Sequence, residues 1–258
     1  MCLIAIAWHA HPTLPLVVAA NRDEWHERPA APAHWWADTP QVLAGRDLQA
    51  GGTWLGVSRY GRFAALTNFR DPSDRKPGAP TRGRLVSDFL QGADSPQQYL
   101  ERLRPTAATY QGFNLLVGDR DVLLCFSSKT GEVSTVTPGV HALSNHTLDE
   151  PWPKVQKAKS ALEAALRAKM PGEARQSLIY ELLSSTEPAP DTALPDTGVG
   201  IEWERLLSPV MIVGEKYGTR CSTFVSLDAA DTWNFCEWTR NPAGVVTHTA
   251  ELSFASAG

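Results

Sequence analysis

The run Cys2-Leu3-Ile4-Ala5-Ile6-Ala7-Trp8, followed by the run Leu16-Val17-Val18-Ala19-Ala20, decides the fold of this chain. Both runs are short and apolar, as buried strands are, and the connection between them contains the turn-forming segment His9 to Thr13. This spacing predicts an antiparallel hairpin of two largely buried strands. Antiparallel pairing would place the start of the first strand beside the end of the second.

The rest of the chain groups into blocks of strands and blocks of helices. A Pro- and Trp-rich segment at 29–40 is expected to cross between elements without regular structure. Further strands are expected at 41–44, 53–58, 63–68, 115–117, 122–127, 133–137, 210–213, 221–227, 232–238 and 245–248. Helices are expected at 82–91, 96–103, 151–170 and 174–183, and Ser95 is the expected N-cap of the second. This order favours an α+β fold in one domain, 1–258, with two stacked antiparallel sheets between helical layers.

Bulk properties exclude several classes of function. The net charge is −4 with a pI near 6.0, and Lys and Arg are scattered, which disfavours nucleic acid and anionic membranes as partners. Four cysteines without a CxxC pair predict neither a metal site nor a disulfide framework. Without a signal peptide or an apolar run long enough to span a bilayer, the chain is expected to be cytoplasmic, with no integral membrane segment.

Cys2 and the cluster Asn21-Arg22-Asp23-Glu24-Trp25 are the candidate reactive residues. If Met1 is removed, Cys2 carries a thiol and an α-amine, which together make a nucleophile and its proton acceptor. Arg22 would favour the thiolate, and Asp23 or Glu24 would hold the Arg and orient the amine. The structural alternatives are a small buried Cys side chain and an ion pair that ties a strand end to a loop.

Several further blocks identify a family. They are Gly51-Gly52-Thr53-Trp54-Leu55-Gly56, Leu66-Thr67-Asn68-Phe69-Arg70, Gly112-Phe113-Asn114-Leu115, Leu143-Ser144-Asn145-His146-Thr147-Leu148-Asp149, Pro151-Trp152-Pro153-Lys154 and Tyr217-Gly218-Thr219-Arg220. Together with Asn21-Arg22-Asp23-Glu24, they span almost the whole chain. The chain resembles the NRDE family, also called the transport and Golgi organization protein 2 family.

That family is similar to the N-terminal nucleophile hydrolases of the penicillin V acylase and bile salt hydrolase branch. The resemblance implies a four-layer αββα sandwich, Cys2 as nucleophile, Asn145 as oxyanion donor, and Cys-dependent hydrolysis of a linear C–N amide in a small molecule. The acylases read Arg-Asn-x-Asp-Trp, so alignment on Trp25 places Glu24 opposite their Asp and Asn21 opposite their Arg. Either Arg22 with Asp23 or Asn21 with Glu24 can therefore carry the roles beside the thiol.

Six residues are candidates for substrate binding: Asn21, Trp25, Trp54, Asn68, Arg70 and Arg220. Asn68 and Arg70 either line the cleft or merely end a strand. Arg220 stands in an apolar strand context, so it is expected to be buried and paired, since burying it unpaired would be costly. Asn145 has its own structural alternative as a turn or capping residue.

The alternative function is a carrier without catalysis. The family is associated with haem trafficking and with acyl-CoA or lipid metabolism, and nine tryptophans offer aromatic walls for such a ligand. No cofactor is expected to be required; haem would be cargo, and its axial ligand could come from His9, His11, His26 or His34. A pure scaffold is disfavoured because no low-complexity segment is present. The sequence does not predict the oligomeric state.

Overall fold

The computed structural model describes residues 2–168 and 172–257, and in these ranges the chain forms two antiparallel sheets. The first sheet contains, in spatial order, β10 (Gly139–Leu143), β1 (Cys2–His11), β2 (Leu14–Trp25), β11 (Tyr217–Leu227), β12 (Thr232–Arg240) and β13 (Val246–Ala255). The second contains β3 (Ala30–Trp35), β4 (Val42–Asp47), β5 (Leu55–Ser58), β6 (Phe63–Asn68), β7 (Phe113–Gly118), β8 (Leu123–Ser127) and β9 (Glu132–Thr135).

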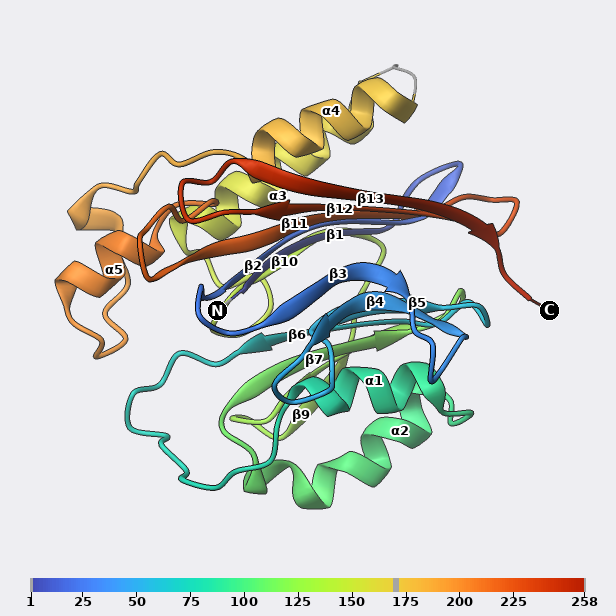
Figure 1. Ribbon diagram of the computed structural model, residues 1–258, viewed down its shortest axis with the longest axis horizontal. Helices are drawn as coiled ribbons and strands as arrows, with labels where there is room; N and C mark the ends of the chain where they lie inside the picture. Colours follow the sequence, from blue (N-terminus) through green and yellow to red (C-terminus); the bar gives the residue numbers. More distant parts are fainter. Residues whose placement is uncertain (1, 169–171, 258) are drawn as a thin grey trace.

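Helices cover the outer face of each sheet (Figure 1). The second sheet is covered by α1 (Gly83–Gln91) and α2 (Pro96–Leu103), and the first by α3 (Pro153–Arg167) and α4 (Gly172–Leu183). The short helix α5 (Ile201–Leu207) lies at one end, and two 3-10 turns span Arg104–Thr109 and Asp191–Ala193. The order helix, sheet, sheet, helix confirms the four-layer αββα sandwich.

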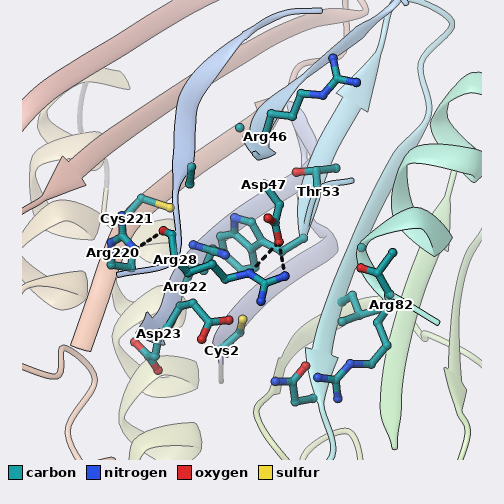
Figure 2. Close-up of a pocket in the computed structure, with 18 of the residues that line it drawn as sticks. Cys2, Arg22, Asp23, Arg28, Arg46, Asp47, Thr53, Arg82, Arg220 and Cys221 are labelled. Atoms are coloured by element: carbon teal, nitrogen blue, oxygen red, sulfur yellow. Dashed lines mark hydrogen bonds and ion pairs between the residues drawn. The ribbon is translucent and has the colours of Figure 1, made fainter. Parts of the chain in front are cut away.

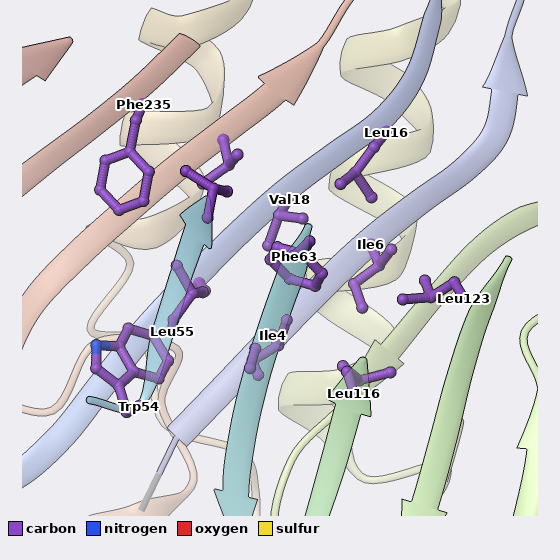
Figure 3. Close-up of a cluster of buried hydrophobic side chains, with 14 of the residues drawn as sticks. Ile4, Ile6, Leu16, Val18, Trp54, Leu55, Phe63, Leu116, Leu123 and Phe235 are labelled. Atoms are coloured by element: carbon purple, nitrogen blue, oxygen red, sulfur yellow. The ribbon is translucent and has the colours of Figure 1, made fainter. Parts of the chain in front are cut away.

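Three apolar cores separate the four layers, and the hairpin β1–β2 contributes to two of them. Ile4 and Ile6 of β1 face the second sheet, with Leu16 and Val18 of β2 beside them (Figure 3). The alternating residues of both strands, such as Leu3, pack against the helical layer instead. Because both faces are buried, each strand is a continuous apolar run rather than an alternating one. The third core lies between the second sheet and helices α1 and α2.

Local signals explain where two helices begin. Ser95 caps α2 as predicted: its hydroxyl accepts from the backbone N–H of Gln98, whose side chain accepts from the Ser95 N–H in return. Pro153 begins α3, where its missing N–H costs nothing. The predicted end of this helix near Met170 falls on 169–171, outside the described residues.

Two sequence predictions about local structure are wrong. The segment 210–213 is not a strand, because its backbone bonds join no ladder: the N–H of Met211 donates to the Ser185 carbonyl and that of Ile212 to the Thr219 hydroxyl. Val210 instead packs in the core between the first sheet and its helices, and Ile212 packs against Leu207 and Tyr217. The segment 29–40 contains β3, and strand β10 and helix α5 were not predicted either.

Candidate functional site

A cavity of about 350 Å³ lies between the two sheets at the end where β1 begins (Figure 2). Its wall contains nine charged side chains, five of them arginines and four acidic. The charged wall residues are Arg22, Arg28, Arg46, Arg82, Arg220, Asp23, Glu24, Asp47 and Glu237. Cys2 and Cys221 also line the wall, together with Thr53, Trp54, Leu66 and Asn68. The N-terminal cysteine and the strand-end cluster therefore meet at one cavity.

Cys2 lies directly opposite Arg22 in the β1–β2 ladder, as the hairpin prediction required. On the other side of β2, Cys221 of β11 is also paired with Arg22. The Cys2 side chain is only 6% exposed. Burial raises the pKa of its thiol; the charge of Asp23 acts in the same direction, while Arg22 and the backbone N–H of Asp23 lower the pKa. Arg22 thus favours the thiolate against the effect of burial.

Asp23 and Glu24 both line the cavity, but their environments differ. Asp23 is buried, and its Oδ1 accepts a hydrogen bond of 2.7 Å from the hydroxyl of Thr219. Burial raises the pKa of Asp23, whereas nearby Lys154 and the Thr219 bond lower it. Glu24 is partly exposed and accepts from the backbone N–H of Trp25 at 2.9 Å. The Thr219 hydroxyl therefore fixes the buried carboxylate of Asp23, whereas the carboxylate of Glu24 is partly exposed at the cavity wall.

Asn21 is not part of the cavity wall. Its Nδ2 donates to the carbonyls of Leu183 and Val210, at 2.9 and 2.8 Å, so its side chain ties β2 to the helical layer. Of the two pairs that the sequence left open beside the thiol, Arg22 and Asp23 lie together there, whereas Asn21 faces away from it.

Asn145 follows β10, next to the start of β1. Because Ile4 pairs with Leu143, continuing the antiparallel register by two residues brings Asn145 opposite Cys2. The hydroxyl of Ser144 donates to the Cys2 carbonyl at 3.1 Å, which holds the two segments together. The Nδ2 of Asn145 donates to the carbonyl of Asn68 at 2.9 Å. One of its two amide hydrogens is therefore committed to the fold.

The predicted binding residues divide into two groups. Trp54, Asn68 and Arg220 line the cavity, whereas Trp25 and Arg70 are not among its lining residues. The ring of Trp25 is 43% exposed and packs edge to face on Trp203 and Tyr217, outside the cavity. Arg220 is half-buried and paired, but with backbone carbonyls: its Nη1 donates to the carbonyls of residues 25 and 28 at 2.9 and 2.8 Å.

Arg70 belongs to a buried ionic cluster rather than to the cavity. Its guanidinium forms an ion pair with Glu204 of α5, and both side chains are 3% exposed. It also stacks over the ring of Trp152 at 4.6 Å. Burial lowers the pKa of Arg70, and Glu204 opposes that effect. The ion pair thus stabilises the charges of both buried side chains.

Sequence reasoning missed most of the remaining wall. Arg28 pairs with Asp47 at 2.7 Å, and Arg82 lies within electrostatic range of Cys2 and Glu24 while donating to the Gly112 carbonyl. These residues come from separate strands and loops, so no local pattern reveals them.

Glu237 did leave a signal in the sequence. It is a carboxylate between Cys236 and Trp238 in an apolar strand, and it is buried. Its Oε1 accepts from the Ala33 N–H at 2.8 Å, and burial raises its pKa. A charged residue in such a strand predicts a buried polar site.

The histidines considered as haem ligands lie elsewhere. His9, His11, His26 and His34 are all absent from the cavity wall. Within residues 2–168 and 172–257, no group of three or more His, Cys, Asp or Glu side chains is arranged to hold a metal ion. No helix of the same ranges is long and apolar enough to cross a bilayer.

The fold and this site define a class of protein: an αββα sandwich in which an internal strand begins with a cysteine that faces an arginine-lined cavity. Residues 1–242 match the family described as Transport and Golgi organisation 2, and the chain belongs to that family. Transport and Golgi organization 2 homologs from Homo sapiens, Bos taurus and Mus musculus are 34%, 33% and 31% identical to it. Each alignment covers 92% of both chains.

The similar solved structures are more distant in sequence. A conjugated bile acid hydrolase mutant from Clostridium perfringens is 10% identical, with a TM-score of 0.45 over 98% of this chain and 92% of that chain. The Caenorhabditis elegans ortholog of N-acylethanolamine-hydrolyzing acid amidase is also 10% identical, with a TM-score of 0.42 over 86% of this chain and 92% of that chain. At these values, neither activity transfers to this chain.

Proposed function

We propose that this protein is an N-terminal-nucleophile-type amidohydrolase in which Cys2 cleaves a linear C–N amide bond of a small molecule. The observation that carries the proposal is the position of the Cys2 thiol, at the wall of a cavity and opposite Arg22. A cavity of about 350 Å³ is within the usual size range of small-molecule sites.

In the proposed reaction, removal of Met1 makes Cys2 the first residue. Its α-amine accepts the thiol proton, and Arg22 stabilises the resulting thiolate. The sulfur attacks the carbonyl carbon of the amide and forms a tetrahedral intermediate. The ammonium returns its proton to the leaving amine as the C–N bond breaks, and water then hydrolyses the thioester. Asp23, which is fixed by Thr219, orients the amine.

Asn145 is the proposed oxyanion donor. Its amide donates one hydrogen to the Asn68 carbonyl, which fixes the side chain. Asn145 is fully buried and is not among the lining residues of the cavity, so the proposal requires that the substrate oxygen reach its second amide hydrogen behind the wall. Such a donor typically contributes about 3 to 4 kcal/mol to stabilisation of the transition state. Trp54 and Asn68 would contact the bound substrate from the cavity wall, and Glu24 would lie near the leaving group.

The test is Cys2→Ala, with Cys125→Ala as its matched control. Cys125 is also a buried cysteine, but it lies in the apolar core and does not line the cavity. We expect Cys2→Ala to lower the hydrolysis of N-acyl amides by a factor of at least 10³, with little change in melting temperature. Cys125→Ala should retain turnover. Turnover is measured as the release of amine from a panel of acyl amides. Intact-mass spectrometry of each variant detects the loss of Met1. Equal turnover by wild type and Cys2→Ala would overturn the proposal.

The carrier alternative is favoured by a specific feature, the five arginines of the wall. Arginine pairs well with carboxylate and phosphate groups, which haem and acyl-CoA both carry. Haem, if it binds, would be held without axial ligation by His9, His11, His26 or His34, since none of them lines the cavity. Tight binding of haem or acyl-CoA by wild type and Cys2→Ala alike, without turnover, would favour carriage over hydrolysis.

A further inference from the structure

A lysine is buried behind the strand that carries Cys2. Lys154 lies in the first turn of α3, which packs against β1 and β10. Lys154 is 3% exposed, and its Nζ has no hydrogen-bond partner. None of the ion pairs formed by the described residues involves it either. Keeping an ammonium in such a place is costly unless a nearby charge requires it.

The titratable and charged groups around Lys154 come from five other parts of the chain. Those that act on its charge are Arg70 after β6, Glu204 on α5, Asp23 on β2 and Cys2 on β1. Tyr217 on β11 adjoins the same group, within electrostatic range of Asp23, Cys2 and Arg70.

The two carboxylates of this group have different partners. Glu204 is satisfied by its ion pair with Arg70 and by Thr197, which donates its backbone N–H at 3.1 Å and its hydroxyl at 2.6 Å to Oε1. Asp23 accepts from the Thr219 hydroxyl, and Lys154 is the first of the charges that lower its pKa. The charges of Lys154 and Asp23 thus lower the cost of each other's charged form. Asp23 in turn borders Cys2, to whose thiol its backbone N–H donates.

We propose that Lys154 is a positioning residue for the Cys2 thiol, whose ammonium offsets the negative charge of the buried Asp23 carboxylate and so favours the Cys2 thiolate from the helical side of the sheet. The inference rests on the proposed role of Cys2 as nucleophile. It adds a charged group on the face of the sheet opposite the cavity, so that Cys2 lies between Arg22 on one side and Lys154 on the other.

The pH range of this effect follows from the protonation of Lys154. Burial lowers the pKa of Lys154 to about 8; Arg70 acts in the same direction, and Asp23 and Cys2 oppose it. The ammonium is present below that pH and is lost above it. Its support for the thiolate is therefore nearly full at pH 6 to 7 and is lost as the pH rises through about 8.

The experiment measures the rate at which iodoacetamide alkylates Cys2 between pH 6 and 10. The thiolate sulfur attacks the methylene carbon and iodide leaves, so the rate follows the thiolate fraction whether or not the protein hydrolyses amides. Mass spectrometry of the N-terminal peptide separates Cys2 from the other three cysteines and compares chains with the same N-terminus. For Lys154→Met we expect a rate about tenfold lower at pH 7, equivalent to one unit in the thiol pKa, and a rate within about twofold of wild type at pH 9.5.

Three further variants separate charge from packing. Lys154→Arg keeps the charge and should stay within about threefold of wild type at pH 7. Lys157→Met removes a charge from the exposed face of the same helix, where Lys157 pairs with Glu187, and should change nothing. Lys154→Gln carries the same expectation as Lys154→Met if the latter fails to fold.

The outcomes distinguish this inference from the proposed function. Two results would overturn the role of Lys154 and leave Cys2 as the nucleophile. One is alkylation of Lys154→Met at the wild-type rate at pH 7; the other is alkylation that is slower in Lys154→Arg than in Lys154→Met. The expected Lys154 effect in a protein that hydrolyses no amide would support the inference and refute the hydrolase. A wild-type Cys2 that fails to react at any pH would overturn both.

Discussion

The interior between the two sheets is filled at one end and hollow at the other, although the same strands build both ends. At the filled end, Ile6 and Val18 pack against Phe63 and Leu116 of the second sheet. At the hollow end, the same faces of β1 and β2 carry Cys2 and Arg22, and the space beyond them is the cavity. Both pairs lie on the inner face because side chains alternate along a strand.

The comparison shows that the site is built on the same strands as the core, at the end where their inward side chains change from apolar to polar. Strand pairing continues unchanged through residue 22, while the side chains switch from apolar to polar and long. The arginines cannot pack as closely as aliphatic side chains without leaving their charges unsolvated, so the sheets remain separated by the cavity at this end. We therefore expect substitutions at the filled end to change stability, and substitutions at the hollow end to change the chemistry.

The largest effect is expected when a large side chain at the filled end is truncated. Phe63→Ala should destabilise the protein by about 3 to 5 kcal/mol, because Phe63 is fully buried between the sheets. Asn68→Ala, at the cavity end of the same strand, should cost less than about 1 kcal/mol. Urea denaturation of both variants measures the difference. Similar costs for the two would contradict the division into a filled and a hollow end.

Next in size is the effect of Asn145→Ala on chemistry. We expect turnover about a hundredfold lower, from loss of the oxyanion donor, and about 1 kcal/mol less stability, from loss of the bond to the Asn68 carbonyl. Ser144→Ala is the control, since it also removes buried hydrogen bonds but takes no donor from the substrate. Single-turnover rates with thermal melts decide; a lower melting temperature with an unchanged rate makes Asn145 structural.

A smaller effect is expected for Arg22→Met. Losing this guanidinium raises the thiol pKa of Cys2, because Arg22 lowers it in the folded protein. At pH 7, alkylation of Cys2 should slow about tenfold, equivalent to one pKa unit, while the melting temperature changes little. Arg102→Met, which removes an exposed arginine paired with Asp94, should leave alkylation unchanged. An unaltered rate in Arg22→Met would remove Arg22 from the proposed site.

The smallest effect concerns Glu237→Gln and its dependence on pH. Burial raises the pKa of Glu237 in the folded protein, so wild type loses stability as the pH rises from the ordinary carboxyl value through the folded one. Gln keeps the oxygen that accepts from Ala33 but carries no charge. The variant should thus match wild type near pH 4 and melt a few degrees higher at pH 8. Melting curves at both values test this, and a variant less stable than wild type at pH 8 would refute it.

The elements that were predicted from the sequence are those whose signals are local. The β1–β2 hairpin follows from two apolar runs and a short connection, and it alone places Cys2 beside Arg22. The start of α2 follows from Ser95 and Pro96, which satisfy the first turn without help from the rest of the protein. In both cases the physical cause lies within a few residues of its effect.

The features that were missed depend on distant partners. Strand β3 contains Pro32, which argues against a central strand, but β3 is the edge of its sheet and shifts register between Ala31 and His34. The segment 210–213 is apolar because Val210 and Ile212 pack in buried clusters, not because the segment pairs with a strand. Likewise Arg82 and Glu237 reach the cavity only once the two sheets have stacked.

The order of strands has a consequence for how the protein is made. All strands of the second sheet come from one continuous part of the chain, 30–135, whereas the first sheet pairs β2 with β11, almost 200 residues later. Contacts between distant residues form slowly, and chains emerge from the ribosome with the N-terminus first. The nascent chain can therefore assemble the second sheet while β2 still lacks its neighbour. Cys2 enters the chain almost first, yet its surroundings are completed among the last, after residue 221 has been synthesised.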